Sequence, residues 1–116
     1  MKSLLGMIIL SLGCAQPTGE QGLNAARMIG LMARLPMAAG GTTVNRLCGS
    51  GLQALHQATH AILASAEDVQ IVGGFEHMLR VPIEPQPDVN PKLFRHTSRA
   101  ALQMGLTAEF LAQSQG

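Results

Sequence analysis

Hydrophobic and polar positions follow one another along the chain in runs that predict three strands separated by helices. The apolar run Met7–Leu12 has the length of a buried strand and ends at Gly13. Thr42–Leu47, which begins with β-branched residues, and Val69–Phe75 are the other two predicted strands. This order indicates an α/β layered domain, and we expect a mixed sheet with packed helices in which helical crossovers join parallel strands.

Helical periodicity covers the segments between these strands. Gly22–Leu35 places apolar residues close to a helical repeat, and Pro36 closes it. Leu52–Ser65 carries larger apolar residues on one face, which we expect to pack on the sheet. That face consists of Leu52, Leu55, Thr59, Ile62 and Leu63.

The last third of the chain has a different pattern. Val81–Pro91 holds four of the six prolines, which excludes regular helix or central strand and predicts a loop or arm. Two short helices are predicted after it, over Ser98–Met104 and Thr107–Gln113, with Thr107 as the cap of the second.

Composition narrows the class of protein. The 116 residues make one domain at most, and they are 47% hydrophobic, 13% charged and 3% aromatic, with a net charge of +1. A basic patch and an aromatic platform are both missing, so we expect no nucleic-acid partner. Two cysteines make no disulfide framework and favour a reduced, cytoplasmic setting. A chain so apolar and so small is expected to bury part of its surface against another chain or the rest of a larger fold.

The start of the chain allows two interpretations. Lys2 and the apolar run that ends at Gly13-Cys14 resemble a short signal peptide of the lipoprotein type. The alternative, a buried strand over Met7–Leu12, fits better because only one positive charge precedes the run and Ser11 stands where a lipoprotein signal usually has leucine. The run is too short to span a bilayer, so we expect no membrane segment.

Cys48 is the strongest candidate for chemistry. It stands between a predicted strand and a predicted helix, and the first turn of a helix favours the thiolate form of a cysteine. Gly49 and Gly51 leave room for a substrate carbonyl, and nearby backbone N–H groups can stabilise an oxyanion. The arrangement suits a nucleophilic cysteine. A buried, inert thiol explains the same residue equally well by spacing alone.

The same residues allow a nucleotide-binding hypothesis. Gly49–Ala54 fits the G-x-G-x-x-G/A pattern after a strand. The acid that should bind the ribose is badly placed, because Glu67 and Asp68 precede the following strand and Glu76 lies too far along.

The remaining candidates are expected to have structural roles. His56 and His60 have the spacing of a metal-binding pair but lack an evident third ligand, so we predict no metal site. We expect Glu76 and His77 to be structural hydrogen-bonding residues and Cys14 to be inert. The cations of the later part are expected to be solvated, although phosphates are possible partners; they are Arg80, Lys92, Arg95 and Arg99.

The segment Thr43–Ala54, which reads TVNRLCGSGLQA, resembles the nucleophile motif of the thiolases. Segments on both sides resemble the family in the same order, so that the similarity runs from about Gly13 to Gly116; they are Gly13-Cys14, Glu20–Gly22, Asn24–Arg27, Val72–Met78 and Met104–Glu109. Leu55-His56 and Glu76–Met78 are most similar to 3-ketoacyl-CoA thiolase, the β subunit of the bacterial fatty-acid oxidation complex.

The resemblance implies a fold, a reaction and partners. Residues 1–116 would form part of a thiolase N-terminal domain, with the loop region beginning at about residue 80. Cys48 would be the acyl-accepting nucleophile of a fatty-acid β-oxidation acyltransferase, with coenzyme A as co-substrate and no other cofactor. A homodimer paired near Thr42–Leu47 is implied, and the α subunit of the oxidation complex is a possible further partner.

The chain also departs from the family pattern. The Asn-Glu-Ala-Phe segment, the Gly-His-Pro segment and the second Cys motif of thiolases are absent, and Met1–Leu12 differs from the family's first strand. We therefore interpret the chain as a fragment and expect no thiolase turnover from it alone. A non-catalytic remnant or dimerisation module is the alternative.

Overall fold

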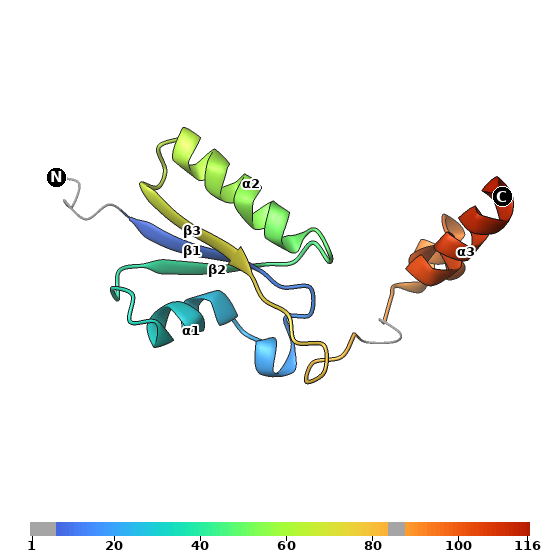
Figure 1. Cartoon of the computed structure of the whole chain (residues 1–116), viewed down its shortest axis with the longest axis horizontal. Coiled ribbons are helices and arrows are strands. Elements are labelled where there is room, and N and C mark those ends of the chain that lie inside the picture. Colours follow the sequence, from blue (N-terminus) through green and yellow to red (C-terminus); the bar gives the residue numbers. More distant parts are fainter. Residues whose placement is uncertain (1–6, 84–87) are drawn as a thin grey trace. The chain divides into compact units, whose positions relative to one another are not determined.

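The computed structural model describes residues 7–83 and 88–116, which belong to two compact units, 1–83 and 84–116. Residues 1–6, at the start of the signal-like segment, and 84–87, within the predicted proline-rich loop, lie outside this description. The first unit holds a sheet and two α-helices, whereas the second is helical (Figure 1).

The sheet has the strand order β2-β1-β3 and both of its pairings are parallel. β1 is Ile8–Gly13, β2 is Gly40–Val44 and β3 is Val69–Gly74. Within the described residues the sheet is therefore parallel rather than mixed, because each connection is a helical crossover that brings the chain back in the same direction. The predicted strand at the start of the chain is confirmed as β1, which is buried on both faces along its second half.

The two helices cover opposite faces of the sheet (Figure 1). α1, Ala25–Met32, packs on β1 and β2, and α2, Ser50–Leu63, packs on β1 and β3. Asn24 caps α1 by accepting a hydrogen bond from the Arg27 N–H, so this helix begins three residues later than predicted. The α/β class and the layered arrangement are confirmed.

The predicted core face of α2 is wrong. Its large apolar residues point away from the sheet and are between 42% and 77% exposed: Leu52, Leu55, Ile62 and Leu63. The residues that face the sheet are small, namely Ser50, Ala54 and Ala58. When a helix has apolar residues on two faces, the helical periodicity of the sequence allows either face to be the buried one. The short distance between helix and strands decides that the face with small side chains is buried.

The core of the first unit is correspondingly thin. Leu10, Leu12 and Ala26 form its buried centre, with Leu35 and Phe75 packed against them. Gly41 permits the close approach of β2 and α1, because a Cβ at this position would lie 2.6 Å from the backbone of Arg27.

In the second unit, two 3-10 turns, Pro91–Arg95 and Ala100–Leu102, precede α3, Met104–Gln115. The two predicted C-terminal helices are thus replaced by a short turn and one longer helix. Thr107 lies inside α3 rather than at its cap, where its hydroxyl donates to the Gln103 carbonyl at 3.3 Å. All residues of α3 are exposed, and none of residues 88–116 is buried.

Candidate functional site

The carboxyl ends of the three parallel strands lie at one edge of the sheet, which is where α/β proteins place their ligands. The loops that leave this edge carry three of the residues singled out in the sequence. Cys14 follows β1, Cys48 follows β2 and Glu76 follows β3. The Cys14 N–H donates to the Val44 carbonyl at 2.9 Å, which extends the β1–β2 pairing to the last residue of β2.

Cys48 is a free, exposed thiol two residues before the first residue of α2. The predicted location at a strand–helix junction is therefore confirmed. The strand ends at Val44, three residues earlier than predicted, and the chain turns sharply before the helix begins. Leu47 has φ 48° in that turn, a left-handed conformation that non-glycine residues seldom adopt. The turn thus presents the sulfur to solvent at the positive end of α2.

The first turn of α2 packs directly on the ends of β1 and β3. A Cβ on Gly13 would overlap the backbone of Ser50 and Gly51, and a Cβ on Gly74 would lie 3.9 Å from Gly51 Cα. The absence of a side chain at Gly13 therefore fixes how closely the helix start, and with it the Cys48 turn, approaches the sheet. At Gly51 itself a Cβ would meet open space.

A second polar cluster joins the loops after β1 and β3. Gln21 Nε2 donates to Glu76 Oε1 at 2.5 Å and to the Gln16 carbonyl at 2.9 Å, and Gln21 Oε1 accepts from the His77 N–H at 2.6 Å. Glu76 Oε2 accepts from the Ala15 N–H at 2.6 Å. Glu76 is thus the structural hydrogen-bonding residue that the sequence predicts, whereas His77 contributes its backbone N–H and the role predicted for its side chain stays a prediction. Gln21, buried in the centre of this cluster, was missed, because a single glutamine in a turn carries no periodic or motif signal.

The thiol of Cys14 lies within this cluster and is buried. Burial raises the pKa of the Cys14 thiol, and the charge of Glu76 raises that pKa further. Burial opposes ionisation of Glu76 as well, but the hydrogen bonds from Gln21 and the Ala15 backbone outweigh it, so the pKa of Glu76 is lowered. The raised pKa keeps the Cys14 thiol protonated, which is consistent with the inert role expected of it.

The acids required by the nucleotide-binding hypothesis lie at the wrong end of the sheet. Glu67 and Asp68 precede β3, and Asp68 accepts a hydrogen bond from the Met7 N–H at 3.2 Å beside the amino end of β1. Gly49 and Gly51 lie at the opposite, carboxyl edge. Because a parallel strand separates the two groups, these acids cannot reach a nucleotide bound at the glycines.

The histidines and cations form no further site in the part of the chain that is described. Across residues 7–83 and 88–116, no group of three or more His, Cys, Asp or Glu side chains is placed to hold a metal ion. Arg80 pairs with Glu20 at 2.8 Å on the surface, and the Arg99 guanidinium lies 4.4 Å from the centre of the Phe94 ring. No helix of the described residues is long and apolar enough to cross a membrane.

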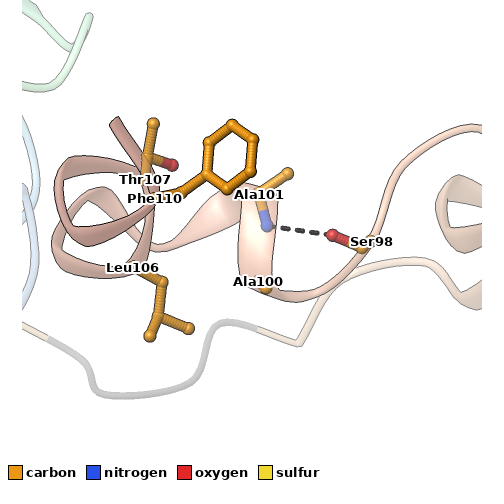
Figure 2. Close-up of a pocket in the computed structure, with 6 residues that line it drawn as sticks. All are labelled: Ser98, Ala100, Ala101, Leu106, Thr107 and Phe110. Atoms are coloured by element: carbon orange, nitrogen blue, oxygen red, sulfur yellow. Dashed lines mark hydrogen bonds between the residues drawn. The ribbon is translucent and has the colours of Figure 1, made fainter. Parts of the chain in front are cut away.

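The second unit contains a shallow apolar pocket of about 320 Å³. Figure 2 shows Phe110 and Leu106 of α3 beside the preceding turn. In that turn the Ser98 hydroxyl oxygen accepts a hydrogen bond from the Ala101 N–H at 3.1 Å. The side chains of the lining are small or apolar and include no titratable group, so the pocket can hold a hydrophobic group but supplies no acid or base.

Comparisons with known proteins place this arrangement in a family. The model of the thiolase N-terminal domain matches residues 7–116. The 3-ketoacyl-CoA thiolase of Psychrobacter sp. (strain PRwf-1) is 50% identical over 104 residues, which cover 90% of this chain and 27% of that protein. The 3-ketoacyl-CoA thiolases of Vibrio vulnificus (strain YJ016) and Colwellia psychrerythraea are 47% and 48% identical over the same shares.

The chain spans about a quarter of the length of the curated relatives it matches. The match nevertheless includes all three strands, both helices of the first unit and the Cys48 turn, so the resemblance seen in the motif extends over the described fold. From this coverage we conclude that the chain belongs to the thiolase family.

Proposed function

We propose that this chain supplies the nucleophile of a 3-ketoacyl-CoA thiolase, an acetyl-CoA C-acyltransferase of fatty-acid β-oxidation. The observation that carries the proposal is the exposed thiol of Cys48, presented before α2 within a chain about 50% identical to 3-ketoacyl-CoA thiolases. The substrate class follows from the names of those relatives.

In the proposed reaction, the Cys48 thiolate attacks the keto carbon of a 3-ketoacyl-CoA. The bond between that carbon and its neighbour breaks, acetyl-CoA leaves after its enolate takes up a proton, and the shortened acyl group stays on sulfur as a thioester. The thiol of a second coenzyme A loses its proton and takes the acyl group, which frees Cys48 in a ping-pong cycle. Coenzyme A is thus a co-substrate, and no other cofactor takes part.

The turn before α2 supports this assignment. A thiolate at the positive end of a helix is stabilised by the helix dipole. The Cys48 backbone N–H is proposed to donate a hydrogen bond to the negative charge that develops on the substrate carbonyl oxygen, whereas the N–H groups of Gly49 and Ser50 already donate to backbone carbonyls of the turn. Proton transfer requires an acid and a base near the sulfur, and the Glu76 carboxylate at this edge of the sheet already accepts hydrogen bonds from Gln21 and the Ala15 N–H. The proton-transfer groups are therefore proposed to lie on another part of the active enzyme.

A half-reaction tests the proposal without requiring the whole cycle. Incubation with radiolabelled acetyl-CoA is expected to transfer one acetyl group to Cys48, identified by peptide mass spectrometry and lost when hydroxylamine cleaves the thioester. Cys48→Ser should abolish the label, whereas Cys14→Ser should retain it, because Cys14 is buried and protonated. Absence of label from correctly folded chain would instead support the alternative of a non-catalytic remnant or dimerisation module.

We also propose a homodimer that forms through β2 in the cytoplasm, with an α subunit of an oxidation complex as a further partner. β2 is an edge strand of the described sheet, and Thr42 on it is exposed. A lysine blocks the addition of a strand to such an edge. Thr42→Lys is therefore expected to raise the dimer dissociation constant at least about tenfold in sedimentation equilibrium. An equal dissociation constant in Thr42→Lys and in the control Thr59→Lys, on α2, would rule out pairing through β2.

A further inference from the structure

The turn that carries Cys48 is held by two polar side chains on either side of it. Ser50 Oγ accepts a hydrogen bond from the Arg46 N–H at 2.9 Å and donates one to the Leu47 carbonyl at 2.5 Å. Asn45 Oδ1 accepts from the Leu47 N–H at 2.9 Å. Three backbone groups of the turn are thus satisfied by side chains.

Backbone bonds and one long side chain complete the arrangement. The Gly49 N–H donates to the Arg46 carbonyl and the Ser50 N–H donates to the Leu47 carbonyl, both at 3.0 Å. The Arg46 guanidinium donates to Gln53 Oε1 at 2.7 Å, which attaches the Cys48 turn to the fourth residue of α2. The segment between β2 and α2 is therefore bound to the helix that follows it.

The Ser50 hydroxyl is buried, unlike that of Thr59, the other hydroxyl residue of α2. It is only 4% exposed, and its oxygen is used as both donor and acceptor within the turn. Thr59, further along the same helix, is exposed and its hydroxyl donates to the Leu55 carbonyl at 2.9 Å. A buried hydroxyl that is fully used has a structural task, whereas an exposed one that bonds to the preceding turn of its own helix contributes little.

The bonds have a specific consequence for Cys48. Leu47 at φ 48° holds a left-handed conformation that is unfavourable for a residue with a side chain, so the turn would relax if nothing held it. The Leu47 side chain is 64% exposed and contributes little packing that could supply that energy. The Ser50 hydroxyl donates to the Leu47 carbonyl and Asn45 Oδ1 accepts from the Leu47 N–H, so both bonds hold this residue and offset the cost of its conformation.

From this geometry we propose that Ser50 and Asn45 are positioning residues that hold the Leu47 turn and thereby fix the Cys48 sulfur at the start of α2. The inference rests on the proposed function for its catalytic meaning. It makes a separate claim about the reactivity of the thiol, which can be measured with a reagent that is not a substrate.

The experiment compares the rate at which iodoacetamide alkylates Cys48 in the folded chain and in a peptide of residues 44–53. Mass spectrometry of the separate peptides distinguishes Cys48 from the buried Cys14. The folded chain is expected to react about two- to fivefold faster, the factor that a helix terminus gives to a nearby anion. Ser50→Ala is expected to bring the rate to that of the peptide, and Ser50→Thr, which keeps the hydroxyl, to restore it. Thr59→Ala is the matched control and should leave the rate unchanged.

Asn45 provides a second test that does not depend on a buried site. Because Asn45 is exposed, its variants preserve the packing of the unit. Asn45→Leu should lower the alkylation rate by the same factor, and Asn45→Ser, which keeps an uncharged oxygen acceptor for the Leu47 N–H, should restore it. Equal rates in Asn45→Leu, Asn45→Ser and wild type, with unchanged circular dichroism, would overturn the proposal.

Acetyl transfer from acetyl-CoA, measured on the same variants, separates this proposal from the proposed function. A wild-type chain that is alkylated faster than the peptide but takes no acetyl group contradicts the thiolase assignment and leaves the positioning role in place. If acetylation occurs, Ser50→Ala and Asn45→Leu should each slow it about tenfold or more, since misplacement of a nucleophile by a fraction of an ångström has effects of that order. Unchanged acetylation in both variants contradicts the positioning role.

Discussion

At the scale of single residues, the chain holds two cysteines in opposite environments at one edge of its sheet. Cys48 is exposed on a turn, whereas Cys14 is buried within the Gln21–Glu76 cluster. The difference comes from the chain just after each strand: β1 continues into a loop covered by Gln21, and β2 continues into a turn that projects from the start of α2. The reactivity expected of each thiol therefore follows from its exposure.

The Glu76 carboxylate is expected to make the stability of the first unit depend on pH. Its pKa is lowered on folding, so its contribution is present above the ordinary value of 4.5 and is lost as the pH falls through the folded-state value. Urea unfolding between pH 7 and pH 3 is expected to show this loss in wild type and a smaller one in Glu76→Gln. Glu109→Gln, on the exposed helix α3, serves as control and should behave as wild type.

A pH dependence that is identical in Glu76→Gln and wild type would contradict the contribution of the hydrogen bonds from Gln21 and Ala15. At higher pH the Cys14 thiol acts in the opposite sense. Its raised pKa stabilises the fold below the ordinary value of 9.0, and this contribution is lost as the pH rises through the folded-state value.

At the scale of elements, close contact between α2 and the sheet depends on small residues on both sides. Ala54 and Ala58 face the strands, and Gly13 leaves room for the backbone of the first helical turn. The helix start and the Cys48 turn are positioned by this contact. An added side chain there must move one element away from the other.

Gly13→Ala is accordingly expected to destabilise the first unit by about 1–3 kcal/mol, the usual cost of overpacking. It should also change the alkylation rate of Cys48, since α2 must shift. Gly105→Ala, in α3, is the matched control, because a Cβ there meets no atom within 4 Å and alanine favours helix over glycine. Guanidinium unfolding of both variants checks the expectation, and equal midpoints would show that the contact tolerates a methyl group.

At the scale of the whole molecule, large apolar side chains remain uncovered on the outer side of α2. Leu52 and Leu63 are 59% and 77% exposed, beside smaller residues that are fully buried. A helix with apolar residues on both sides is typical of one that is covered on both sides. Exposed patches of this kind lead to association with other surfaces.

Leu52→Lys and Leu63→Lys are therefore expected to change the free energy of unfolding by less than about 0.5 kcal/mol, as surface substitutions do. They should also reduce light scattering and the binding of the dye ANS by the isolated chain. Ala58→Lys, at a position 4% exposed, should by contrast unfold the first unit. Strong destabilisation by both leucine variants would mean that the outer face of α2 is packed rather than open.

The sequence by itself determined the class of fold, the three strands and the position of Cys48 before a helix, because periodicity and turn residues act over a few neighbouring positions. The Thr43–Ala54 motif also indicated the family to which the chain belongs. Only the tertiary structure decided which face of α2 is buried, since that depends on how closely helix and sheet approach. It likewise brought Gln21 to Glu76, 55 residues apart in the chain, a pairing that no local pattern encodes.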